Sequence, residues 1–137
     1  MVNILKYLTP KSQVSCLNSE MSIRQGLEKF RVHGYTSVPV INEDGTYYGV
    51  ISEGDFLWDI VNNDYEFIQQ LENKKIKDMV HKKVPSCKMN MDIDDIISFI
   101  TNYNFVPIVD DRNILMGIIT RKSIINFLRD KEQNQTL

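Results

Sequence analysis

The strongest constraint on the fold of this 137-residue chain is an internal repeat. Ser37–Ile41 aligns without a gap with Phe105–Val109, and Gly49–Ser52 aligns with Gly117–Thr120, at an offset of 68 residues in both cases. Upstream, the offset from Ile23 to Ile93 is 70, so the second copy is two residues shorter between its first helix and the strand that follows. A repeat of this length predicts two copies of one supersecondary unit.

Both copies show the same predicted order of elements, strand-helix-strand-strand-helix. In the first copy, apolar periodicity and turn residues predict a strand over Val14–Leu17, a helix capped by Ser22, a hairpin with Gly45 in its turn, and a helix over 53–62. In the second copy they predict a strand over Val84–Cys87, a helix capped by Asp92, a hairpin with Asn113 in place of the glycine, and a helix over 122–129. Pro39 and Pro107 are expected to bend or end the pairing of their strands.

This pattern predicts an α+β fold of two tandem β-α-β-β-α repeats packed with pseudo-twofold symmetry. Neither repeat, at about 60 residues, would bury a comfortable core alone. The predicted boundaries are a first repeat with the N-terminal segment over 1–63, a linker helix region over 64–83, a second repeat over 84–130 and a polar, frayed tail over 131–137. Apolar positions in the linker, from Tyr65 to Leu71, are expected to pack as a helix. Its lysines are interpreted as a solvated face, with attraction of phosphate as the alternative.

Composition excludes several classes of function. Sixteen basic and eighteen acidic residues give a net charge of −2, which disfavours non-specific nucleic-acid binding. No apolar run reaches the roughly 18–20 residues that a membrane span needs, and the N-terminus does not resemble a signal peptide. Two cysteines without nearby ligand-spaced histidines disfavour a disulfide scaffold or a metal site. We therefore expect a cytoplasmic protein with reduced thiols and with no nucleic-acid or membrane partner.

The junction after the second hairpin strand carries the clearest candidate chemistry. Ser52 and Asp55 are spaced to meet a phosphate and the two hydroxyls of a ribose, although either residue could simply cap the helix. In the second copy, Thr120 matches Ser52, but Ser123 stands where the carboxylate would be. Arg121 and Lys122 instead place two cations at that helix start, against the helix dipole, which suggests an anion; the alternative is two solvated charges.

The repeat resembles a CBS-domain pair (Bateman module) over about Thr9 to Arg129. The resemblance rests mainly on Gly34–Pro39 and on Gly49–Asp55, with the pattern Gly-x-x-Ser-x-x-Asp. It implies adenosine-type ligands, namely AMP, ADP, ATP, S-adenosylmethionine or cyclic di-AMP, in clefts between the repeats, and it implies dimerisation. Gly34–Pro39 together with Thr120–Lys122 also resembles the small stand-alone bacterial CBS proteins that bind cyclic di-AMP.

Carried over residue by residue, the resemblance implies two clefts. One would combine Ser15, Cys16, Tyr35, Thr36, Ser37 and Val38 with Thr120, Arg121 and Lys122. The other would combine Ser86, Asn104, Phe105 and Val106 with Ser52 and Asp55. Tyr35 and Phe105 could stack on a base, with ordinary core packing as the alternative.

These observations predict a non-catalytic regulatory module that binds an adenine nucleotide and signals to a protein partner, since no nucleophile–base pair or metal signature is visible. A cyclic di-AMP receptor, a small enzyme acting on adenine nucleotides and a structural dimer with vestigial clefts are the alternatives. A homodimer is expected through helical faces rich in apolar side chains. The residues expected on these faces are Phe56, Leu57, Ile60, Ile124, Ile125 and Phe127.

Overall fold

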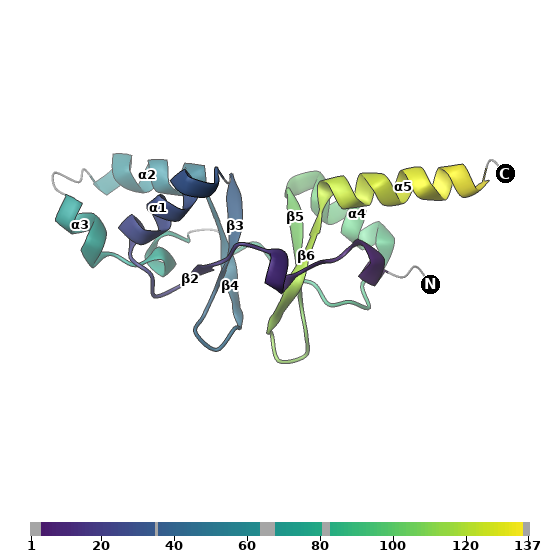
Figure 1. Cartoon of the computed structure of the whole chain (residues 1–137), viewed down its shortest axis with the longest axis horizontal. Coiled ribbons are helices and arrows are strands. Elements are labelled where there is room, and N and C mark those ends of the chain that lie inside the picture. The colour runs from purple at the N-terminus through teal and green to yellow at the C-terminus, as the bar shows by residue number, and fades with distance from the viewer. Residues whose placement is uncertain (1–3, 35, 64–67, 81–82, 136–137) are drawn as a thin grey trace. The chain divides into compact units, whose positions relative to one another are not determined.

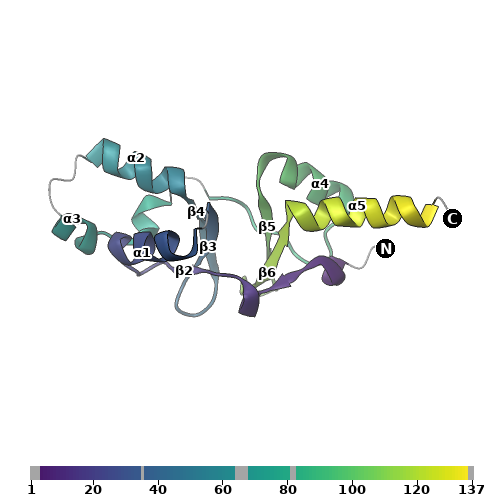
Figure 2. The same ribbon diagram turned by 45° about the horizontal axis from the view of Figure 1, so that its top comes forward.

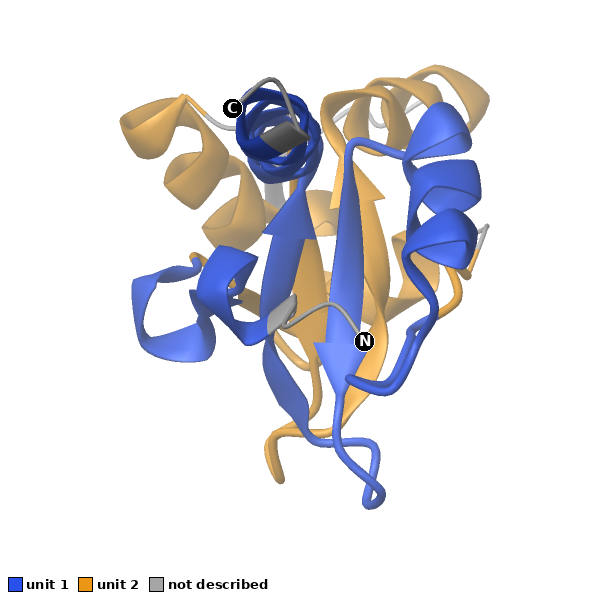
Figure 3. Ribbon diagram, turned by 90° about the vertical axis from the view of Figure 1, so that its right-hand side faces the viewer, with its two compact units in different colours: residues 1–14, 86–137 blue, residues 15–85 orange. Residues whose placement is uncertain are grey.

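The fold consists of two compact units, each built on a three-stranded sheet. The computed structural model describes residues 4–34, 36–63, 68–80 and 83–135. One unit comprises residues 15–85, and the other comprises residues 1–14 together with 86–137 (Figure 3). In each unit the two main helices lie on one face of the sheet (Figures 1 and 2). The predicted α+β class with two β-α-β-β-α repeats is confirmed.

The unit of residues 15–85 contains the first repeat. Its strands lie in the order β2-β3-β4, with β2 parallel to β3 and β3 antiparallel to β4. Two further helical segments follow α2 within the same unit. In chain order the elements are β2 (Leu17–Asn18), α1 (Ile23–His33), β3 (Ser37–Ile41), β4 (Tyr47–Ser52), α2 (Glu53–Asn63), α3 (Ile68–Asn73) and the 3-10 turn η3 (Ile76–Met79).

The other unit contains the second repeat and the N-terminal segment. Its strands lie in the order β1-β6-β5, and both pairings are antiparallel. In chain order the elements are η1 (Ile4–Tyr7), β1 (Thr9–Pro10), η2 (Lys11–Gln13), α4 (Ile93–Asn102), β5 (Phe105–Val109), β6 (Leu115–Thr120) and α5 (Arg121–Gln135). Within the described residues, no helix is long and apolar enough to span a membrane.

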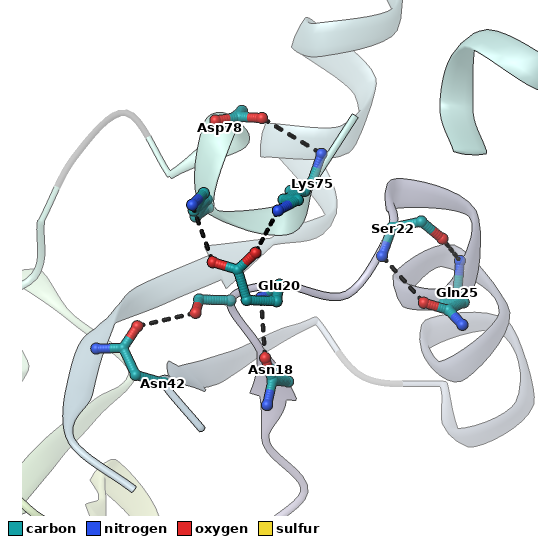
Figure 4. Close-up of polar contacts among 9 residues, drawn as sticks. Asn18, Glu20, Ser22, Gln25, Asn42, Lys75 and Asp78 are labelled. Carbon is teal, nitrogen blue, oxygen red and sulfur yellow. Dashed lines mark hydrogen bonds and ion pairs between the residues drawn. The ribbon is translucent and has the colours of Figure 1, made fainter. Parts of the chain in front are cut away.

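Local sequence signals place the helix starts and the hairpin turns as predicted. The Ser22 hydroxyl accepts a hydrogen bond from the Gln25 N–H, and the Gln25 side chain accepts one from the Ser22 N–H (Figure 4). Asp92 caps α4 with a single bond, since its side chain accepts a hydrogen bond from the Asp94 N–H. Gly45 and Asn113 both adopt the left-handed conformation, with φ of 87° and 65°. Asn113 therefore takes the place of the turn glycine in the second hairpin.

Each unit has its own hydrophobic core between its sheet and its helices. In the first unit, the core includes Ile23 from α1 and Ile51 from β4, both fully buried. In the second, it includes Ile96 from α4 and Ile119 from β6, also fully buried. Ile51 and Ile119 occupy equivalent places in the two repeats, so the duplication extends to this part of the packing.

Three sequence expectations about the strands and the C-terminal helix are corrected. The opening strands are shorter than predicted: β2 covers only Leu17–Asn18, and among the described residues of 84–87 only Cys87 bridges a strand, pairing with Ile108. Pro85 has no N–H to donate to a ladder, which fits this limit. Pro39 and Pro107 do not end their strands, since each is paired within an antiparallel ladder, but a register shift follows each proline by one residue, at Val40/Ile41 and Ile108/Val109.

The third correction concerns α5. It continues to Gln135, six residues past the predicted end at Arg129. The stretch after Arg129 contains lysine, glutamate and glutamine, which are good helix formers, and it contains no glycine or proline. The polar residues after Arg129 therefore continue the helix.

The N-terminal segment packs in the unit of the second repeat, although the sequence analysis placed it with the first. Thr9 and Pro10 pair with Ile118 and Gly117 of β6. The Tyr7 ring contacts the Phe127 ring edge-on at 5.3 Å between centroids, and its hydroxyl donates to Asp130 Oδ2 at 3.2 Å. The pairing of β1 with a strand over 100 residues away is a non-local contact that leaves no local pattern in the sequence.

The segment after α3 is part of the first unit's core. Ile76 and Met79 of η3 are fully buried there, and the Ile76 N–H donates to the Met21 carbonyl at 2.8 Å. The predicted linker helix is observed only over Ile68–Asn73, and the predicted apolar positions Tyr65 and Phe67 lie outside the described residues. The linker is therefore a structural part of the repeat.

Two lysines of this segment form ion pairs with Glu20, which corrects the solvated-face interpretation for them. The Glu20 carboxylate pairs with Lys75 (Figure 4). It also pairs with Lys77, at 2.9 Å. The hydrogen bonds from Lys75 and then Lys77 lower the pKa of Glu20 to about 2. These contacts attach the segment to the turn between β2 and α1.

Candidate functional site

In the first repeat, the predicted site residues gather at one end of the hairpin. Ser37 of β3 lies opposite Ser52 of β4, and the Glu53 N–H donates to the Thr36 carbonyl at 3.0 Å. Thr36 is exposed, whereas Ser37 and Ser52 are half-buried. Tyr35, the predicted stacking residue, lies outside the described residues. The end of β4 and the start of α2 thus bring hydroxyl groups from two strands together.

Ser52 and Asp55 form a reciprocal cap at the start of α2. Asp55 Oδ2 accepts from the Ser52 N–H at 2.8 Å, and Ser52 Oγ accepts from the Asp55 N–H at 3.3 Å. The capping alternative is therefore realised. The cap uses only part of the hydrogen-bonding capacity of the Asp55 carboxylate and the Ser52 hydroxyl. Within the described residues, the Asp55 Oδ1 atom accepts no hydrogen bond and the Ser52 hydroxyl donates none. An acceptor and a donor stay available to a ligand.

The second repeat has the same backbone frame with different side chains. Phe105 of β5 lies opposite Thr120 of β6, and the Arg121 N–H donates to the Asn104 carbonyl at 3.0 Å. Thr120 Oγ1 accepts from the Ser123 N–H at 3.1 Å and donates to Ser123 Oγ at 2.9 Å. No carboxylate stands at this helix start, so the two repeats offer different chemistry.

Arg121 binds backbone carbonyls at the end of α4. Its Nε and Nη2 atoms donate to the Ile100 carbonyl at 3.1 and 2.8 Å, and Nη2 also donates to the Tyr103 carbonyl at 3.3 Å. From the sequence alone, the cation of Arg121 at the start of α5 indicates an anion bound at that helix start. A cation at the C-terminus of α4 is favourable in its own right. Neighbouring Lys122 is exposed and forms no hydrogen bond or ion pair with any described residue.

The other predicted site residues differ in accessibility. Val38, Phe105 and Val106 are buried, with relative exposures of 4%, 8% and 0%. Ser15 and Asn104 are exposed, and Cys16 and Ser86 are half-buried. Val38 and Val106 belong to the two cores, so only their backbone groups could face a ligand. Each predicted cleft draws on residues of both units, and its assembly stays a prediction.

In the part of the chain that the structure describes, no three histidine, cysteine, aspartate or glutamate residues are grouped so that they could hold a metal ion. Burial, followed by the charge of Asp95, raises the pKa of the Cys87 thiol to about 11. A thiol with this pKa stays protonated at neutral pH and is a poor nucleophile.

Sequence reasoning missed the intramolecular partner of Arg121, although the sequence contains a signal for it. The connection before β5 is short, and the residue equivalent to Arg121 in the first repeat is Glu53, which cannot donate. The short connection and the arginine in place of glutamate occur together in the second repeat. Either difference alone is typical of ordinary variation at a protein surface.

Comparison with known proteins agrees with the duplicated architecture. The family model of the CBS domain matches residues 6–62 and 76–130. An uncharacterised protein of Methanocaldococcus jannaschii is 31% identical over 128 residues, which cover 72% of this chain and 76% of that protein. Two other relatives from this archaeon are longer, and the chain spans 46% and 43% of their lengths.

Solved structures show the same fold. The crystal structure of CbpB in complex with c-di-AMP is 25% identical with a TM-score of 0.89, and the match covers 98% of this chain and 89% of that one. CbpB from Streptococcus agalactiae is 26% identical with a TM-score of 0.86, and the match covers 95% of this chain and 82% of that one.

Proposed function

The chain belongs to the CBS-domain family, and from this premise we propose that it is a non-catalytic regulatory module that binds adenosine-type nucleotides and signals to a protein partner. The observation that carries the proposal is the hydroxyl group at the start of the last helix in both repeats, Ser52 and Thr120. Each stands at the N-terminus of a helix, where a phosphate binds well. The proposed location is the cytoplasm, and the proposed partners include neither nucleic acid nor membrane.

The first repeat supports recognition of a nucleoside. Asp55 keeps one carboxylate oxygen for a ribose hydroxyl, and Ser52 keeps its hydroxyl hydrogen for a phosphate oxygen. Gly54, between them in the first turn of α2, has no side chain to cover the Ser52 hydroxyl. We propose that this end accepts AMP, ADP or ATP, together with Ser86, Asn104, Phe105 and Val106.

The second repeat supports a ligand richer in phosphate. Thr120 and exposed Lys122 offer a hydroxyl and a positive charge, with Ser123 in place of the carboxylate. The likeness to CbpB, whose structure contains c-di-AMP, favours cyclic di-AMP as a second candidate ligand. Ser15, Cys16, Tyr35, Thr36, Ser37 and Val38 complete this proposed site, whereas the guanidinium of Arg121, also expected there from the sequence, is bound to the Ile100 and Tyr103 carbonyls. S-adenosylmethionine is a further adenosine compound to test.

Adenine nucleotides are expected to raise the melting temperature of the protein, and Asp55→Asn is expected to reduce that effect for AMP and ATP. At about a hundred times its dissociation constant, a ligand adds roughly 2.7 kcal/mol to stability, which corresponds to about 5–10 °C for a chain of this size. Asparagine can keep the bond to the Ser52 N–H but loses the charged acceptor. A tenfold weaker affinity would remove about half of the shift.

The measurement is a thermal-shift screen with AMP, ADP, ATP, S-adenosylmethionine, cyclic di-AMP and GTP. Ser123→Ala is the matched control, because it changes the equivalent position of the other repeat and should leave the AMP shift intact. Equal shifts with GTP and ATP would show that the base is not recognised. Turnover of ATP by the purified protein would support an enzyme, and no shift with any nucleotide would support a structural dimer.

We also propose a homodimer through exposed apolar residues of α2 and α5. Leu57, Trp58 and Val61 of α2 are 58–60% exposed, and Ile125 of α5 is 51% exposed. Of the residues expected on these faces, Phe56, Ile124 and Phe127 are instead buried within their own unit. The remaining apolar surface is the kind that association covers.

Light scattering is expected to give about twice the 16.0 kDa chain mass at micromolar concentration, and Trp58→Glu is expected to give the monomer mass. Val32→Glu, on α1, is the matched control, because Val32 is 73% exposed and lies outside the proposed interface. A dimer that persists in Trp58→Glu would place the interface elsewhere.

A further inference from the structure

The end of the first helix is closed by different means in the two repeats. In the first repeat, α1 ends at His33 and Gly34 caps it in the left-handed conformation with φ of 67°. The Gly34 N–H donates to the Phe30 carbonyl at 2.8 Å. This is the usual glycine cap of a helix. Three residues, 34–36, then lead into β3.

The second repeat has no left-handed glycine at this point, although the Tyr103 N–H makes the equivalent bond to the Phe99 carbonyl at 3.1 Å. Helix α4 ends at Asn102, and Tyr103 follows in an extended conformation with φ of −132°. Only residues 103 and 104 lead into β5. The two-residue deletion thus removes the residue that would turn the chain through the left-handed region, and the last carbonyls of α4 need another donor.

Arg121 supplies that donor from the neighbouring helix. Its guanidinium holds the Ile100 carbonyl through two N–H groups and the Tyr103 carbonyl through one. In the first repeat the equivalent residue, Glu53, makes the same backbone bond to the residue before the strand. Its carboxylate cannot donate a hydrogen bond to a carbonyl.

We propose that Arg121 is a positioning residue, which closes the shortened turn between α4 and β5 and thereby sets Asn104 and Phe105 in the nucleotide site. The proposal rests on the proposed function for its effect on binding. Arg121 fixes Asn104 from two sides, since its backbone N–H donates to the Asn104 carbonyl while its side chain holds the preceding residue. The positive charge for a phosphate then comes from Lys122, which has no competing partner among the described residues.

A positioning role predicts that Arg121→Ala and Arg121→Lys have the same effect, although only the alanine variant loses the positive charge. A lysine keeps the charge, but its single ammonium group cannot reproduce the planar fork that holds two carbonyls. Both variants are therefore expected to bind AMP, the ligand of the site that contains Asn104 and Phe105, about three- to tenfold more weakly, by the same factor at low and high salt. Lys122→Ala is expected to flatten the salt dependence of cyclic di-AMP binding instead.

The experiment combines calorimetry at two salt concentrations with amide hydrogen exchange of the unliganded protein. The Tyr103 N–H, which donates to the Phe99 carbonyl at 3.1 Å, is expected to exchange about three- to tenfold faster in Arg121→Ala. Arg112→Ala is the matched control, since it removes an exposed arginine from the hairpin turn of the same repeat and should change neither exchange nor affinity.

Full affinity in Arg121→Lys, or a flatter salt dependence in Arg121→Ala, would show direct contact with phosphate and overturn the proposal. Unchanged affinity with faster exchange would also overturn it, because the turn would then not affect the site. If the wild-type protein binds no adenine nucleotide, the proposed function fails. In that case Tyr103 exchange alone decides whether Arg121 holds the turn, and unchanged exchange refutes it.

Discussion

Ile76→Ala is expected to lower the free energy of unfolding by about 2–5 kcal/mol, although the residue lies between the two repeats. Its side chain is fully buried in the core of the first unit. A Cβ placed on Gly26 would lie 2.5 Å from the Ile76 Cδ1 atom, so the isoleucine fills the space above that glycine. Truncation would leave a cavity in contact with α1.

Urea denaturation measures this loss of stability, and further variants test whether it comes from the packing of Ile76 against Gly26. Val32→Ala, at a site 73% exposed, is expected to change stability by less than about 0.5 kcal/mol. Gly26→Ala alone should be destabilising because its methyl group meets Ile76, whereas in the double variant that methyl occupies part of the cavity. A double variant that loses the sum of the single losses would contradict this packing, as would an unchanged Ile76→Ala protein.

Gly117→Ala is expected to destabilise the chain by about 3 kcal/mol and to release the N-terminal segment from β6. A Cβ at this position would overlap the Thr9 carbonyl oxygen and lie 3.1 Å from Pro10 Cα. Both are backbone atoms of β1, which cannot move aside as a flexible side chain could. The strand pair therefore requires glycine for its close approach.

Unfolding curves and hydrogen exchange of residues 4–14 test this expectation. Gly54→Ala is the control, since its Cβ would meet only the Ser52 hydroxyl at 3.6 Å and a helical alanine is favoured over glycine. It should leave stability unchanged or raise it by up to about 1 kcal/mol. If the N-terminal segment of Gly117→Ala kept wild-type protection, the close pairing of β1 with β6 would be refuted.

The parts of the fold that could be predicted from the sequence are those with local causes. The capping box at Ser22 and the left-handed Asn113 follow from residues within a few positions of each other. The strand β1 could not be predicted, because Thr9 and Pro10 form too short a segment for periodicity and pair with residues far along the chain. Burial of Ile76 is non-local for the same reason.

The same contrast between local and non-local causes applies to the candidate site. Ser52 and Asp55 were predicted as neighbours at a helix start, and the structure places them in contact. The interpretation of Arg121 as an anion site depended on the dipole of its own helix alone. The end of α4, at Ile100, meets the guanidinium only through tertiary packing, so an argument from α5 alone could not include it.

The division of the chain into units determines where the chain could be cut without opening a core. The chain passes from one unit to the other between residues 14 and 15 and again between 85 and 86. Each repeat is thus completed by the segment that precedes the other one. A fragment ending at residue 63 would contain the first repeat without Ile76 and Met79 of its core, and a fragment beginning at residue 84 would contain the second repeat without the strand that pairs with β6. We therefore expect neither fragment to fold as stably as its unit does in the whole chain.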